Sequence, residues 1–171
     1  MAGDTDATMS AEIRFVRALH YFLLMDGWGN IPFTLEPMTK PEQRSRAQMY
    51  EWLEQELIGI EPALSEAKAK KSTDAGYGRV DKAACWLLIS RLYLNSEIYT
   101  GTAQWQKAKE YADKVIKSSY RLNTVGKGGW TAYQMLFMGD NGETDAAYEA
   151  LLPLLQDGLT TTSWGTSLFL I

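Results

Sequence analysis

The chain has 171 residues, enough for one domain with a sizeable core, and 46% of them are hydrophobic. This apolar content argues against a chain that is disordered throughout. The formal net charge is −4, and no segment supplies a basic face. Nucleic acid is therefore not expected as a partner, because its phosphates would meet a net anion.

The chain has a single cysteine, Cys85, and a single histidine, His20. One cysteine cannot form an internal disulfide or a cysteine-based zinc site, and the apolar helical surroundings of Cys85 favour a buried, inert thiol. His20 stands between Leu19 and Tyr21 and is interpreted as a packing residue inside a helix. The sequence therefore predicts no catalytic residue, no metal site and no cofactor.

The first predicted helix covers residues 10–26. Ser10 is a plausible N-cap, and Gly27 and Gly29 end the helix because glycine adopts backbone angles that other residues avoid. Apolar residues cover most of the circumference of this helix. We therefore expect it to be buried on several sides.

An extended segment and a second helix follow. Residues 31–37 must be extended because Pro32 and Pro37 both disfavour a helix. The second helix is expected to open with residues 39–42, which match a capping box with proline in the first turn. Its apolar residues then recur in steps of three and four as far as Leu64, which indicates one apolar stripe.

The third and fourth helices are predicted over residues 80–99 and 102–118. Only Thr100 and Gly101 separate them, so the two helices must lie antiparallel. Glu110 and Lys114 stand four residues apart and are expected to form an exposed ion pair on the fourth helix.

Residues beyond 120 have a different composition. Glycines mark a loop at residues 126–129, a short helix is predicted at 130–138, and residues 147–155 suit either a strand or a short helix. The chain ends within an apolar run, which favours a piece of a longer protein. We expect three parts: a polar tail at 1–9, a helical-repeat core at 10–120, and an irregular, loop-rich region at 121–171 that is truncated at its C-terminal end.

The third and fourth helices match the tetratricopeptide pattern in part. Trp86, Ser90 and Tyr93 have the spacing at which that repeat places a large, a small and an aromatic residue, and Ala108 and Ala112 supply small residues in the next helix. Small residues let two helices approach closely while aromatic rings fill the groove. The predicted fold class is all-α, with tetratricopeptide-like helical hairpins, irregular loops and little or no β-structure.

Five segments, taken in order, resemble the SusD/RagB family. They are Ala11-Glu-Ile-Arg-Phe-Val-Arg-Ala-Leu-His-Tyr-Phe-Leu-Leu with Trp28-Gly-Asn-Ile-Pro-Phe; Tyr77-Gly-Arg-Val-Asp-Lys-Ala-Ala with the helix through Tyr93; Tyr99-Thr-Gly-Thr with Tyr111-Ala-Asp-Lys-Val-Ile; Leu136-Phe137 with Asp140-Asn141; and Gln156-Asp-Gly with Ser163-Trp-Gly. Members of this family are about three times longer and begin with a lipoprotein signal and an acylated cysteine.

The resemblance implies a protein that binds carbohydrate at the outer surface of the outer membrane and delivers it to a SusC-like TonB-dependent transporter. Starch-like oligosaccharide is the first expectation for the ligand. No enzyme activity is implied, and the membrane would be reached only through a lipid anchor that this chain lacks. The chain taken alone has no secretion signal or long apolar segment, so we expect it to be soluble by itself.

Candidate sugar-binding residues are aromatic and polar residues in loops, because sugar rings stack on aromatic faces while their hydroxyls take hydrogen bonds. Trp164 is the first candidate, with Gln156 and Asp157 near it in sequence, although Trp164 equally suits an anchor of its loop. Trp130 and Tyr133 are the next candidates.

Four other tryptophans are expected to serve in packing. Trp28 follows a helix beside glycines, and three more lie on apolar helical stripes, namely Trp52, Trp86 and Trp105.

Two other functions remain open alternatives. A helical-repeat scaffold that binds only protein would have no glycan site of its own. A glycosidase would need paired carboxylates, for which Asp140, Glu143 and Asp145 are candidates, but a turn offers no apolar environment to raise a pKa. The same turn resembles a calcium loop only in part, since it lacks the closing glutamate.

Overall fold

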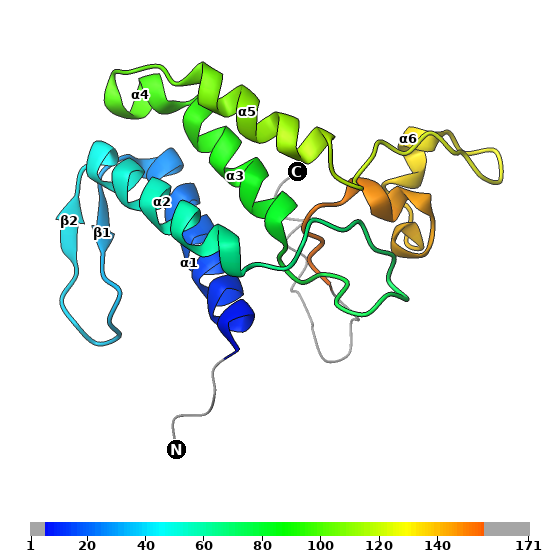
Figure 1. The fold of residues 1–171 in the computed structure, drawn as a ribbon, viewed down its shortest axis with the longest axis horizontal. Helices are drawn as coiled ribbons and strands as arrows, with labels where there is room; N and C mark the ends of the chain where they lie inside the picture. Colours follow the sequence, from blue (N-terminus) through cyan, green and yellow to red (C-terminus); the bar gives the residue numbers. More distant parts are fainter. Residues whose placement is uncertain (1–5, 156–171) are drawn as a thin grey trace.

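The computed structural model describes residues 6–155. Four longer helices form the body of this part, with one small hairpin projecting from one end and a loop-rich region at the other (Figure 1). The longer helices are α1 (Ala7–Trp28), α2 (Arg46–Ile60), α3 (Lys82–Leu94) and α5 (Trp105–Ile116). The short elements are α4 (Ser96–Thr100), α6 (Ala132–Met135), the 3-10 turns η1 (Glu61–Ala63), η2 (Asn141–Glu143) and η3 (Asp145–Glu149), and the strands β1 (Ile31–Phe33) and β2 (Glu42–Arg44). The predicted all-α class is confirmed.

Helix α1 begins earlier and ends later than the sequence predicts. The Asp6 carboxylate accepts a hydrogen bond from the backbone N–H of Thr8, so Asp6 and not Ser10 is the N-cap. Residues 7–9, which we expected in a polar tail, therefore form the first turn. The helix passes through Gly27 and ends at Gly29, whose φ of 77° suits glycine.

Only one face of α1 is buried, so the prediction of burial on several sides is wrong. The inward face carries side chains at steps of three and four, which are Ala11, Phe15, Ala18, Phe22 and Met25. The outward face leaves Ile13 63% exposed and Leu23 51% exposed. The sequence could not separate the two faces because both are apolar.

The segment between α1 and α2 forms an antiparallel hairpin, in which Ile31 pairs with Arg44 and Phe33 with Glu42. Residues 39–42 therefore do not cap α2, contrary to the prediction. The cap lies at Ser45, whose hydroxyl accepts from the N–H of Gln48 while the Gln48 side chain accepts from the N–H of Ser45. This is also a capping box, in the form Ser-x-x-Gln.

An aromatic cluster fixes the hairpin to the first helical pair. Phe33 on β1 lies 5.0 Å from Tyr21 and 4.9 Å from Trp52, measured between ring centroids. The Tyr21 hydroxyl donates to the backbone oxygen of Thr34 at 2.6 Å. Trp52 is half-buried in this cluster, in keeping with its expected packing role.

Helices α3 and α5 form the closely packed antiparallel pair that the repeat pattern predicts, with α4 between them in the chain (Figure 1). The Ser90 hydroxyl donates to the backbone oxygen of Ala108 at 2.8 Å, and both residues are buried. This contact requires two small side chains. Next to it, the rings of Tyr93 and Tyr111 lie 5.8 Å apart and fill the groove.

The predicted pair of Glu110 with Lys114 does not form. Lys114 Nζ instead lies 3.1 Å from a carboxylate oxygen of Glu61, at the end of α2. The indole N–H of Trp86 donates to the same oxygen at 2.6 Å. A tertiary partner therefore replaces the local one, and Trp86 is half-buried beside this group.

The single cysteine and the single histidine of the chain have different environments. Cys85 is fully buried, and its burial raises the pKa of the thiol to about 12, which confirms an inert cysteine. His20 is exposed on α1, and its Nδ1 lies 2.7 Å from the backbone oxygen of Val16. The interpretation of His20 as a buried packing residue is therefore wrong.

Arginines of α1 bind a shared carboxylate on α2. Arg14 contacts Glu56 at 2.6 Å and Arg17 contacts it at 2.8 Å, and the Glu56 side chain is only 10% exposed. The hydrogen bond from Arg14, followed by that from Arg17, lowers the pKa of Glu56 against the opposing effect of burial.

We expect Glu56→Gln to lower the free energy of unfolding by about 1–2 kcal/mol at pH 7. The pKa of Glu56 is lower in the folded than in the unfolded protein. The contribution of Glu56 to the free energy of unfolding is therefore complete above the pKa of the unfolded state, about 4.3, and is lost as the pH falls through the pKa of the folded state. Thermal unfolding followed across pH should therefore show wild type and variant differing at neutral pH and converging at about pH 2–3. A constant difference down to pH 2 would contradict this assignment.

The last described part is irregular. The helix predicted at 130–138 is reduced to α6, and the segment predicted as a strand or helix at 147–155 forms only the end of η3 before turning irregular. Among residues 6–155, no helix combines the length and apolar character that a membrane span requires.

Candidate functional site

Exposed aromatic side chains gather in the loop region around α6. Trp130 is 52% exposed, Tyr133 70% and Phe137 73%. We refer to residues 130–137 as the aromatic segment. Side chains this exposed to solvent do not pack in the core. The segment is therefore a candidate recognition surface.

A tight hairpin presents Trp130. The backbones of Lys127 and Trp130 exchange two hydrogen bonds of 3.1 Å each. Gly128 and Gly129 between them have φ values of 62° and 88°, which only glycine adopts readily at two successive turn positions. The Gly-rich sequence at 126–129 therefore forms an ordered turn that holds the tryptophan at its end.

Helix α6 presents Tyr133, and the turn directly after it presents Phe137. Thr131 and Gln134 form a second capping box, which fixes the start of the helix directly after Trp130. Met135 is buried and anchors the helix, while Tyr133 and Phe137 project outward one turn apart. Their ring centroids lie 5.2 Å apart in a T-shaped pair.

The same loop region carries an exposed pair of charged side chains. Lys127 Nζ is 3.9 Å from a carboxylate oxygen of Asp140, and both side chains remain largely exposed. The Lys127 ammonium donates hydrogen bonds and the Asp140 carboxylate accepts them. The pair can therefore bind sugar hydroxyls that act as acceptors and sugar hydroxyls that act as donors. Apolar faces beside such groups form the arrangement that a sugar ring requires.

The structure places the predicted site residues unequally. Trp130 and Tyr133 lie together in the exposed aromatic segment, whereas Trp164, Gln156 and Asp157 lie outside the described residues. Phe137 was not among the predicted site residues. Its spacing of four from Tyr133, together with the short helix predicted there, is the signal that could have identified it.

Two tryptophans expected in packing are instead exposed. Trp28 is 74% exposed at the end of α1, and Trp105 is 61% exposed at the first position of α5. Trp105 lies on the sequence stripe of Ala108 and Ala112, but a stripe predicts only which face of a helix is apolar, not how much of it a neighbour covers.

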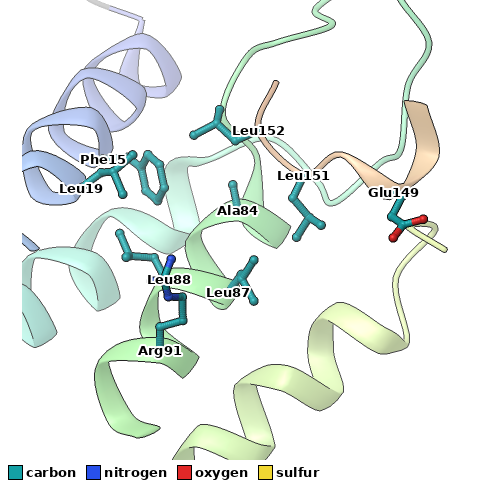
Figure 2. A pocket seen from close by; sticks show the side chains of 9 residues that line it. All are labelled: Phe15, Leu19, Ala84, Leu87, Leu88, Arg91, Glu149, Leu151 and Leu152. Atoms are coloured by element: carbon teal, nitrogen blue, oxygen red, sulfur yellow. The ribbon is translucent and has the colours of Figure 1, made fainter. Parts of the chain in front are cut away.

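A hollow of about 370 Å³ lies between α1, α3 and the last described segment (Figure 2). Phe15 and Leu19 come from α1, and Leu151 and Leu152 reach in from the opposite side. Arg91 and Glu149 also line the hollow, but Phe15, the aromatic residue of its lining, is only 1% exposed, so its ring offers no accessible face for a sugar to stack on. The hollow is therefore a poorer sugar site than the aromatic segment.

The carboxylates of the 140–145 turn do not have the environment of a glycosidase pair. Asp145 pairs with Lys71 at 2.9 Å and Arg121 at 3.4 Å, and the Lys71 hydrogen bond lowers the pKa of Asp145. A general acid needs the opposite shift. Among the residues that the structure describes, no group of three His, Cys, Asp or Glu side chains could hold a metal ion.

The described fold thus defines an all-α protein of tetratricopeptide-like helical hairpins, with exposed aromatic residues in the loops that follow them. The chain is 42% identical over 174 residues to the starch-binding protein SusD of Bacteroides thetaiotaomicron, a match that covers 99% of this chain and 29% of the relative. The chain belongs to the SusD family and corresponds to less than a third of that relative's length.

Solved structures agree on the fold. A SusD-like protein of Bacteroides fragilis superposes with a TM-score of 0.64 at 19% identity, over 91% of this chain and 28% of the other. Surface glycan-binding protein A of Bacteroides uniformis gives a TM-score of 0.57 at 29% identity, over 69% of this chain and 26% of the other. No family model matches the chain.

Proposed function

We propose that this protein binds glycan and that the aromatic segment supplies part of the contact surface. The observation that carries the proposal is the exposure of Trp130, Tyr133 and Phe137 on a hairpin, a short helix and the turn after it. Glycines fix the hairpin, and a capping box fixes the start of the helix. Exposed rings held in place lose little conformational freedom when a sugar stacks on them. The name of the 42% identical relative, a starch-binding protein, supports the same activity.

The finer points of the proposal concern ligand, partner and location. Starch-like oligosaccharide is the proposed ligand, since the relative's name specifies starch. We place the complete protein at the outer surface of the outer membrane, where it delivers glycan to a SusC-like TonB-dependent transporter. This placement rests on the family alone.

The proposed activity is binding without catalysis. Asp140 and Asp145 of the turn are ion-paired, and the lowered pKa of Asp145 keeps it ionised at neutral pH. A protein-binding helical scaffold without a glycan site is the alternative. It predicts that neither the wild-type protein nor any variant that lacks an exposed ring binds sugar.

We expect Trp130→Ala and Tyr133→Ala each to weaken maltoheptaose binding by about tenfold, because a stacked aromatic ring contributes on the order of 1 kcal/mol beyond its area. Isothermal titration calorimetry measures the dissociation constants. The variants should retain the wild-type thermal midpoint, since both rings are largely exposed.

Trp105→Ala provides the matched control, because Trp105 is an equally exposed tryptophan on a different element. It should leave the dissociation constant unchanged. Cellohexaose serves as a second glucan with a different linkage. Equal affinities in wild type, Trp130→Ala and Tyr133→Ala would remove the aromatic segment from the site, and the appearance of new reducing ends would indicate an enzyme.

A further inference from the structure

The loop that carries Trp130 is closed at its base by one side chain. The Asn123 amide donates from Nδ2 to the backbone oxygen of Ala132 at 2.8 Å and to that of Val125 at 3.2 Å. Its Oδ1 accepts from the N–H of Val125 at 3.3 Å. Asn123 therefore joins the two ends of the loop that spans residues 123–132, directly before α6 begins.

Glu149 fixes Asn123 from outside the loop. A carboxylate oxygen of Glu149 accepts the backbone N–H of Asn123 at 2.8 Å. Two residues before Asn123, the N–H of Arg121 donates to the backbone oxygen of Tyr148, the neighbour of Glu149, at 3.1 Å. The segment 121–123 is thus attached along η3, and Figure 2 shows Glu149 at the side of the hollow remote from Phe15.

A close backbone approach completes the loop. A methyl group at Gly126 would overlap the backbone oxygen of Trp130, and it would also lie 3.4 Å from the backbone nitrogen of Ala132. Neither of these atoms belongs to a flexible side chain, so the loop can relieve the overlap only by moving its backbone. Any larger residue at 126 must therefore displace Trp130 itself.

We propose that Glu149 and Asn123 are positioning residues of the glycan site: they hold the loop so that Trp130 and α6 present their rings together. This inference rests on the proposed function. Neither residue touches the rings. Each acts through backbone atoms that flank Trp130, which is why their removal displaces the rings without removing them.

The test uses the protein labelled with 5-fluorotryptophan, in which the Trp130 fluorine signal is assigned by its loss in Trp130→Phe. Glu149→Ala and Gly126→Ala should each shift or broaden that signal without any ligand, and should weaken maltoheptaose binding by about fivefold. Glu149→Gln keeps an oxygen that accepts the Asn123 N–H, so it should restore the signal and bring affinity to within about twofold of wild type. Glu66→Ala is the control, since Glu66 is an exposed carboxylate paired with Lys82.

The outcomes are separable. An unchanged Trp130 signal in both Glu149→Ala and Gly126→Ala overturns the positioning roles, as does a Gln variant no better than the Ala variant. If Glu149→Ala fails to fold, Asn123→Ala removes only the amide and gives the same comparison. A wild-type protein that binds no maltoheptaose overturns the proposed function, and the fluorine signal then still decides the positioning roles.

Discussion

Replacing Phe22 by alanine is expected to lower the free energy of unfolding by about 3–5 kcal/mol. The Phe22 ring is completely buried on the inward face of α1, and the Arg91 guanidinium lies 5.4 Å from its centroid. The substitution removes the apolar burial, leaves a cavity between helices and removes the cation–π contact. Urea denaturation followed by circular dichroism measures the change.

The next residue along the helix is the control. Leu23 is also a large apolar residue of α1, but it is 51% exposed. Leu23→Ala should change the free energy of unfolding by no more than about 0.5 kcal/mol. The two substitutions alter helix propensity in the same turn, so their difference isolates burial. Similar losses at both positions would mean that α1 is buried on two faces.

The helical pairing was predictable because small and large residues alternate at fixed spacing. Ser90 and Ala108 were expected where two helices approach closely, and the hydrogen bond between them now accounts for that choice. The predicted two-residue connection at 100–101 favoured an antiparallel arrangement. That arrangement forms, although residues 95–104, including α4, join the two helices in the structure. The spacing of small and large residues lies within one stretch of sequence. It can therefore be read without knowledge of the tertiary structure.

Element boundaries were less predictable because several segments offered equivalent caps. The residues at 39–42 and those at 45–48 both match a capping box, and only the pairing of β1 with β2 decides between them. Similarly, Lys114 had a suitable local partner in Glu110 but contacts Glu61, which is distant in sequence. Local rules give candidates, and long-range packing selects among them.

The candidate site stays a prediction. A tryptophan and a tyrosine in a glycine-rich region suggested recognition, and the structure shows that the side chains of Trp130 and Tyr133 are exposed. The exposure of Trp28 and Trp105 was not predictable, because a stripe on a helix shows which face is apolar but not how far a neighbour covers it. The contact of Glu149 with Asn123 joins residues 26 apart, and no local pattern signals it.

Asp81 connects three segments of the described fold through one buried carboxylate. As the N-cap of α3, its Oδ1 accepts the N–H groups of Ala83 at 2.9 Å and Ala84 at 3.2 Å. Its Oδ2 accepts the N–H of Lys68 at 3.1 Å and the hydroxyl of Tyr120 at 2.8 Å. Burial, followed by the adjacent Asp81 charge, raises the pKa of Tyr120, so this hydroxyl remains a donor at neutral and moderately alkaline pH.

Asp81→Ala should therefore lower the free energy of unfolding by about 3 kcal/mol, because it removes a helix cap and also leaves buried donors without a partner. Asp6 is the matched control: it caps α1 in the same way but is exposed, and among residues 6–155 its side chain accepts only from Thr8. Asp6→Ala should cost about 1 kcal/mol or less. Asp81→Asn keeps an oxygen that can accept the cap hydrogen bonds, but its amide nitrogen cannot accept the others. Chemical denaturation should therefore give it a free energy of unfolding between those of wild type and Asp81→Ala. Equal losses for the two alanine variants would reduce Asp81 to an ordinary cap, and other contacts would then hold α3, the 65–68 segment and the segment after α5 together.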